Sequence, residues 1–96
     1  MSPKRRKKLN KIRNQLDKLD DSFIKLIKKR TELVKKVLSL KVHKNEIVDK
    51  KRIKSILNNI KKKSLKNKID AKITNRIWKN MIWSFIDYER RNFKKK

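Results

Sequence analysis

The feature that most constrains this chain is a long amphipathic stretch from about Leu9 to Lys41. An α-helix turns by about 100° per residue, so apolar residues at every third or fourth position share one face. The residues that follow this pattern are Leu9, Ile12, Leu16, Leu19, Phe23, Ile27, Val34 and Val37. The stretch is too long for a strand, and it predicts one helix of about 35 residues, which is about 50 Å in length.

Two cations interrupt this apolar face where an aliphatic residue would continue it. Arg30 lies between Ile27 and Val34, and Lys41 lies one turn after Val37. Burying an unpaired cation among aliphatic side chains costs several kcal/mol, so two of them on one face indicate an anionic partner. The alternative is that both side chains lie at the edge of the face, with their stems packed and their charged groups in water.

The composition favours an all-α protein that associates with a second copy of itself. The 96 residues include no Gly, one Pro and no Cys, which favours long helices and excludes disulfides and thiolate metal sites. With 35% apolar residues, a domain this small usually needs an oligomeric partner to bury enough surface. The same long helix of a second copy is the simplest cover for the predicted one.

The next part of the chain predicts a loop and a second helix. The segment 43–48 (HKNEIV) has no helical periodicity, so it is expected to reverse the chain, with the only histidine, His43, exposed. Asp49 is placed to cap a helix that ends near Ser64. The apolar face of this helix consists of Ile53, Ile56, Leu57 and Ile60.

A turn and a third helix follow. In the turn 65–69, Asn67 is the residue best suited to a left-handed conformation in the absence of Gly. Asp70 is expected to cap a helix that ends near Asn92. Its apolar face consists of Ile73, Ile77, Met81, Phe85 and Tyr88. Residues 9–93 therefore form one helical domain, between a basic and frayed N-terminal segment (1–8) and a basic tail (94–96).

Glu89 lies one turn beyond Phe85, at the edge of the third helix's apolar face. This position makes it a second candidate for a partly desolvated charge. The alternative is an ion pair on the surface of the same helix, with Arg90 or Lys94.

The net charge of +24 would by itself favour a nucleic-acid or membrane partner. However, 25 of the 33 cations are lysine and only 8 are arginine, scattered over every predicted face. A protein that reads bases more typically concentrates arginine on one element. No window approaches the length of a membrane span, and no apolar segment follows the basic N-terminus. We therefore expect a cytoplasmic protein with solvated lysines and neither a nucleic-acid nor a membrane partner.

Three segments of the chain resemble the all-helical (type II) chorismate mutase family, and together they cover Leu9 to Glu89. They read IRNQLDKLDDSFIKLIKKRTELVKKVLSLK, IVDKKRIKSIL and RIWKNMIWSFIDYE. The residues at the spacing of the family's pattern are Arg13, Leu19, Asp20, Arg30, Lys41, Asp49 and Arg52. The resemblance implies three helices per chain, one long and two shorter, in an intertwined homodimer. It also implies the pericyclic conversion of chorismate to prephenate in phenylalanine and tyrosine biosynthesis, with no cofactor or metal.

The resemblance also implies a role for each matching residue. Arg30 and the Arg13 of the partner chain would bind the two carboxylates of chorismate, with Arg52 nearby on the ring side. Lys41 would donate to the ether oxygen, and Asp49 would orient the substrate hydroxyl. Helix geometry agrees, because Arg13 and Arg30 lie about 25 Å apart along one helix and cannot grip one small molecule from the same chain.

Three positions depart from the family's pattern. Ile53 stands where many members carry Glu, and Phe85 stands where they often carry Ser, with Ser84 one residue earlier. Glu89 stands where they usually carry Gln. A carboxyl group can donate a hydrogen bond to the ether oxygen only when it is protonated, so Glu89 predicts better activity at acidic pH.

Three other functions stay open at this point. The isochorismate pyruvate lyases share the fold and also tend toward apolar or aromatic residues at the positions of Ile53 and Phe85. Outside enzymes, a basic helical protein could bind nucleic acid through phosphate contacts alone. A degenerate mutase fold could serve as a regulatory subunit, although the intact set of Arg13, Arg30, Lys41 and Arg52 argues against this.

Overall fold

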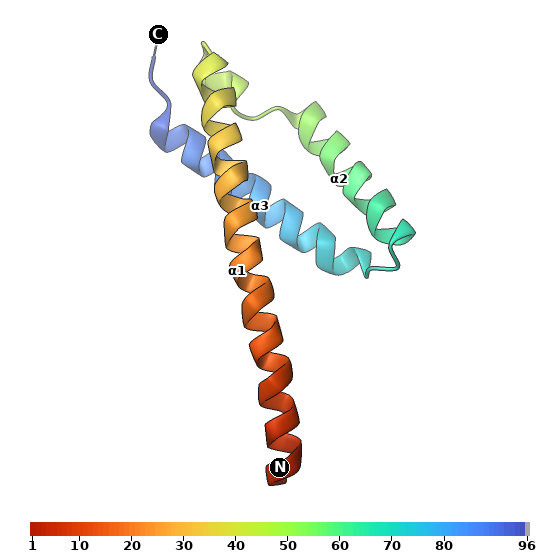
Figure 1. Cartoon of the computed structure of the whole chain (residues 1–96). Helices are drawn as coiled ribbons and strands as arrows, with labels where there is room; N and C mark the ends of the chain where they lie inside the picture. Colours follow the sequence, from red (N-terminus) through yellow and green to blue (C-terminus); the bar gives the residue numbers. More distant parts are fainter. Residues whose placement is uncertain (96) are drawn as a thin grey trace. The chain divides into compact units, whose positions relative to one another are not determined.

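The computed structural model describes residues 1–95, and within that range every regular element is helical. The helices are α1 (Pro3–Leu40), α2 (Lys50–Lys66) and α3 (Ala71–Asn92), with a one-turn 3-10 helix, η1 (Lys44–Glu46), between α1 and α2 (Figure 1). The prediction of one long and two shorter helices is therefore confirmed.

The first helix begins at Pro3, several residues before the apolar pattern starts. Ser2 Oγ accepts a hydrogen bond of 3.2 Å from the Arg5 N–H, and Pro3 occupies the first helical position, where its missing N–H is no loss. The first turn has no acidic residue, so Arg5, Arg6 and the neighbouring lysines oppose the helix dipole. The observed helix α1 thus includes most of the basic N-terminal segment (1–8) that was expected to be frayed.

The chain forms two compact units, Met1–Leu33 and Val34–Lys96. The first unit is the N-terminal part of α1, and its apolar side chains are largely exposed. For example, Leu19 is 58% and Phe23 is 56% exposed. This unit by itself leaves the apolar face of α1 without the cover that a stable helix of this kind needs.

The second unit contains the last turns of α1, η1, α2 and α3. Its core consists of three buried isoleucines, Ile47, Ile82 and Ile86. The partly buried residues packed against them are Leu38, Val48, Ile53, Ile56, Leu57 and Phe93. Ile47 comes from the segment that was expected to be a simple loop, and it enters the core directly after η1. The last turns of α1 are thereby packed, through Leu38, against the pair of helices that follows.

The helices α2 and α3 pack against each other and are joined at one end by a short turn (Figure 1). Both predicted caps are confirmed, since Asp49 Oδ1 accepts from the Arg52 N–H and Asp70 Oδ1 accepts from the Lys72 N–H, each at 2.9 Å. Near the turn, the hydroxyls of Ser64 and Thr74 lie 2.7 Å apart and link the two helices. Ser64 is buried and donates to the carbonyl of Ile60 at 2.6 Å, and Thr74 donates to the carbonyl of Ala71 at 3.3 Å.

The turn between α2 and α3 differs from the expectation at one residue. Lys68, with φ of 55°, takes the left-handed conformation, whereas Asn67 has φ of −94°. The helix runs beyond Ser64 to Lys66, and Asn67 caps it by donating from Nδ2 to the carbonyl of Lys63 at 2.8 Å. The left-handed residue is therefore displaced by one position.

The third helix ends at Asn92, as predicted. Of the predicted tail, Lys94 and Lys95 follow the helix without regular structure, and Lys96 lies outside the described residues.

Candidate active site

The centre of the candidate site is an ion pair between Lys41 and Glu89. Lys41 Nζ donates to Glu89 Oε2 at 2.6 Å, and the side chains are only 16% and 9% exposed. The expectation that Glu89 is partly desolvated is confirmed. Glu89 pairs with Lys41 and not with Arg90 or Lys94. The partner comes from 48 residues away in the sequence.

Helix geometry explains why this pair forms. Lys41 directly follows the last residue of α1, and its N–H still bonds to the carbonyl of Leu38, so its ammonium lies where the helix dipole favours a cation. Glu89 lies one turn before the end of α3, where the same effect disfavours a carboxylate. Lys41 offsets that disadvantage, so each charge depends on the other.

Lys41 and Asp49 line one open hollow, together with Asn45, Glu46, Val48 and Lys50. The fold thus brings Lys41, at the end of α1, close to Asp49, the cap of α2. The family resemblance implies that both residues contact the substrate. Asn45 and Lys50 were not among the predicted site residues. Nothing in their spacing marks them, because their place in the hollow depends on η1, which the sequence pattern did not indicate.

The two apolar departures from the family pattern lie on inward-facing positions. Ile53 is partly buried and packs against the isoleucine core, and Phe85 is also partly buried. Ser84 is exposed, and its hydroxyl donates to the carbonyl of Asn80 at 2.7 Å. Phe85, rather than Ser84, therefore shares the face of α3 that holds Ile82, Ile86 and Glu89.

The candidate arginines lie on different elements. Arg13 is exposed and Arg30 is partly buried, and both belong to the first unit on the continuous helix α1. Arg52 is exposed in the first turn of α2, where its N–H is held by Asp49. Within the second unit, Lys41 pairs with Glu89 and lines one hollow with Asp49. The distance of about 25 Å along α1 keeps Arg13 away from Arg30 of the same chain.

Residues 1–95 offer neither a metal-binding cluster nor a membrane-spanning helix. Within that range, no three His, Cys, Asp or Glu side chains are grouped so that they could hold a metal ion. None of the helices described here has the length and apolar character that crossing a bilayer requires.

Comparison with known families identifies the family of this chain. The model of the family "Chorismate mutase type II" matches residues 12–90, which is most of the chain. The chain belongs to this all-helical family, and its fold and the Lys41–Glu89 pair lie within the matched range. Comparisons with curated proteins and with solved structures gave no match.

Proposed function

We propose that the protein is a chorismate mutase, which rearranges chorismate to prephenate on the route to phenylalanine and tyrosine. The observation that carries this proposal is the partly buried Lys41–Glu89 pair, because it places a fixed cation beside a desolvated carboxyl group in a member of this family. The reaction breaks an ether C–O bond as a C–C bond forms. It needs no nucleophile, so orientation and electrostatic stabilisation of the ether oxygen supply the catalysis.

Lys41 is suited to the donor role even while it is paired. An ammonium group has three N–H donors, and the bond to Glu89 uses one of them. The bond therefore fixes the direction of the side chain and leaves donors for the ether oxygen of the substrate. Arg30, the partner's Arg13 and Arg52 bind the carboxylates, for which the fork of a guanidinium group is well matched. Asp49 orients the substrate hydroxyl.

The proposal includes a homodimer. The apolar face of α1 is exposed over much of its length, with Ile12, Leu16, Leu19, Phe23 and Ile27 each 45% to 58% exposed. An antiparallel α1 from a second copy covers this face and brings its Arg13 beside Arg30. The dimer thus accounts for both the exposed face and the separation of the two arginines.

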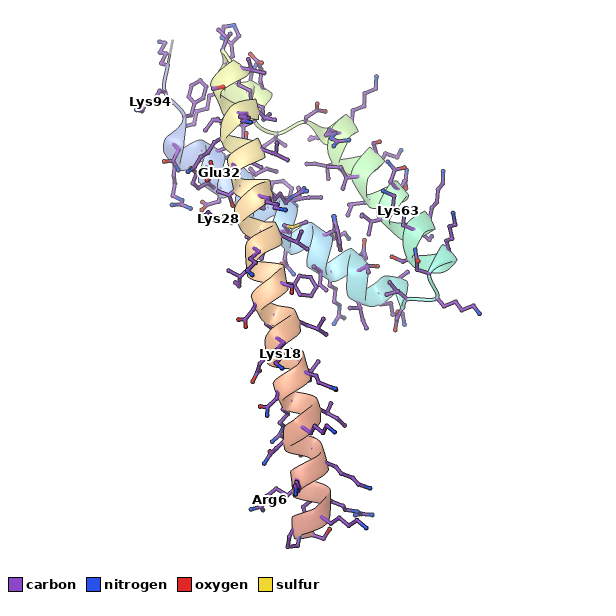
Figure 2. The ribbon with its side chains drawn as sticks, in the orientation of Figure 1. Arg6, Lys18, Lys28, Glu32, Lys63 and Lys94 are labelled. Atoms are coloured by element: carbon purple, nitrogen blue, oxygen red, sulfur yellow. The ribbon has the colours of Figure 1, made fainter. Side chains whose placement is uncertain are left out.

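The test is the loss of chorismate absorbance on addition of purified protein, with the product identified. Wild-type protein is expected to form prephenate, and Arg30→Ala is expected to lower kcat/KM by about 100-fold or more, the typical effect of removing one such charged contact. Lys18→Ala is the matched control, because Lys18 is an exposed cation on the same helix (Figure 2). Equal effects of the two changes would contradict the assignment of Arg30.

Ile53 and Phe85 favour a second candidate of the same fold, an isochorismate pyruvate lyase. Both side chains place apolar surface where many mutases carry a polar group. The same assay with isochorismate distinguishes the two, because the lyase forms salicylate, which is fluorescent, and pyruvate. Salicylate from isochorismate with chorismate left unchanged would move the assignment to the lyase.

A further inference from the structure

A second surface of the protein, separate from the Lys41–Glu89 pair, has the features of a docking groove. Two adjoining hollows of about 440 Å³ and 330 Å³ lie between α2 and α3, and they share Leu57, Asn58 and Asn75. We call their combined surface the α2–α3 groove. Along α2 it extends from Lys50 to Lys61, which is about 16 Å.

The charges of the α2–α3 groove all have one sign. Lys50, Lys54 and Lys61 of α2 and Lys72 and Lys79 of α3 line it from the two sides, and all five are exposed. No Asp or Glu is among the residues that line either hollow. Five cations without an internal counter-charge favour an occupant with several negative charges.

Between its lysines, the groove is apolar. Val48, Ile53, Leu57 and Ala71 contribute aliphatic surface, and Trp83 lies at one end with half of its surface exposed. A half-exposed tryptophan in a hollow is typical of the anchor position of a protein interface. The groove therefore suits an occupant that has apolar side chains between its acidic ones.

The shape and charge of the groove exclude other occupants. A small molecule would leave most of its surface in water in so long and open a hollow. A single-stranded nucleic acid would favour several stacking platforms and arginines, whereas this groove has one exposed ring and only lysines. The second copy of the proposed homodimer is accounted for by the exposed apolar face of α1, none of whose residues lines this groove.

We propose that the α2–α3 groove binds an acidic amphipathic segment of a different protein. One of its apolar side chains packs on Trp83, and its carboxylates pair with the lysines on both sides. Such a contact would attach a partner to the face of α2 and α3 that carries these lysines. Val48, Lys50 and Ile53 lie where the groove borders the candidate active site. The proposal does not rest on the mutase activity, since Lys54, Lys61, Lys72, Lys79 and Trp83 are not assigned to that site.

The experiment uses the full chain and a fluorescein-labelled synthetic peptide of about 16 residues. The peptide has Leu at helical spacing of three and four and Glu or Asp at most other positions, and a scrambled peptide has the same composition. Binding is measured by fluorescence anisotropy at about 150 mM salt, where long-range charge effects are screened. Wild-type protein is expected to bind the amphipathic peptide at least about fivefold more tightly than the scrambled one.

Two double variants with the same charge change locate the binding site. Lys54→Glu with Lys79→Glu reverses charges in the groove, and Lys18→Glu with Lys28→Glu reverses charges on α1 outside it (Figure 2). The first is expected to weaken binding by at least tenfold, and the second by about twofold or less. Trp83→Ala is expected to weaken it severalfold, and circular dichroism checks that each variant keeps its helices.

Three outcomes would overturn the proposal. Equal losses in the two double variants, or equal affinity for the scrambled peptide, would show attraction by net charge alone. No binding of the amphipathic peptide at about 100 μM would exclude the proposed class of partner. A fluorescein-labelled oligo-dT of 16 nucleotides that binds more tightly than the peptide, with a loss in Trp83→Ala, would assign the groove to single-stranded nucleic acid.

Discussion

Glu89 is 7% exposed, and its carboxyl group lies within hydrogen-bonding distance of Lys41. When ionised it can only accept, and when protonated it can also donate to the ether oxygen of the substrate. In Glu89→Gln the amide can donate to the ether oxygen and still accept from Lys41, so kcat/KM at neutral pH should increase by about tenfold.

The control is Asp87→Asn, which also replaces a carboxylate of α3 by an amide but at an exposed position, and it should keep the wild-type kcat/KM. No increase in Glu89→Gln, or an equal increase in both variants, would contradict the role given to Glu89.

The Lys41–Glu89 pair also has a consequence for stability. Lys41→Met leaves a buried carboxylate without its cation, and breaking such a pair from one side typically costs about 3 kcal/mol or more. We expect urea unfolding to show a loss of that size. The double variant Lys41→Met with Glu89→Leu, which leaves no buried charge, should regain most of the stability. A double variant no more stable than Lys41→Met would show that packing, not charge, explains the loss.

At the scale of the elements, the caps of α2 and α3 offer a matched comparison between structure and function. Asp49 and Asp70 each accept one hydrogen bond of 2.9 Å from the first turn of a helix. Asp49→Ala and Asp70→Ala should each lower the free energy of unfolding by about 1 kcal/mol. Only Asp49 lines the hollow of Lys41, so only Asp49→Ala should also raise the KM for chorismate severalfold. Similar kinetics in the two variants would restrict Asp49 to its capping role.

These elements also show which parts of the structure could be predicted from the sequence. The three helices and both aspartate caps follow from local periodicity and short-range hydrogen bonds. The burial of Ile47 and the pairing of Lys41 with Glu89 depend on how distant segments pack, so no local pattern contains them. Asn67 was wrongly given the left-handed conformation because its side chain instead caps the last turn of α2, a competition that composition alone does not decide.

At the scale of the whole molecule, the amphipathic pattern predicted the length of α1 and an apolar face in need of cover. The chain on its own does not supply that cover, since Leu16, Leu19 and Phe23 are each more than half exposed. The same separation holds for the candidate site, because the matched family residues Arg13 and Arg30 lie far apart on one helix. The symmetric dimer that we propose would resolve both points, and it would make each of two equivalent sites depend on both chains.

This dependence can be tested by mixing two inactive variants, Arg13→Ala and Arg30→Ala. If Arg13 acts across the interface, a mixed dimer has one site with both arginines and one site with neither. Random pairing after joint unfolding and refolding makes half of the dimers mixed, so the mixture should recover about a quarter of the wild-type activity. The two variants refolded separately and assayed at once after mixing serve as the control and should stay inactive. If Arg13 acts within its own chain, neither site of a mixed dimer is complete, and joint refolding would restore no activity.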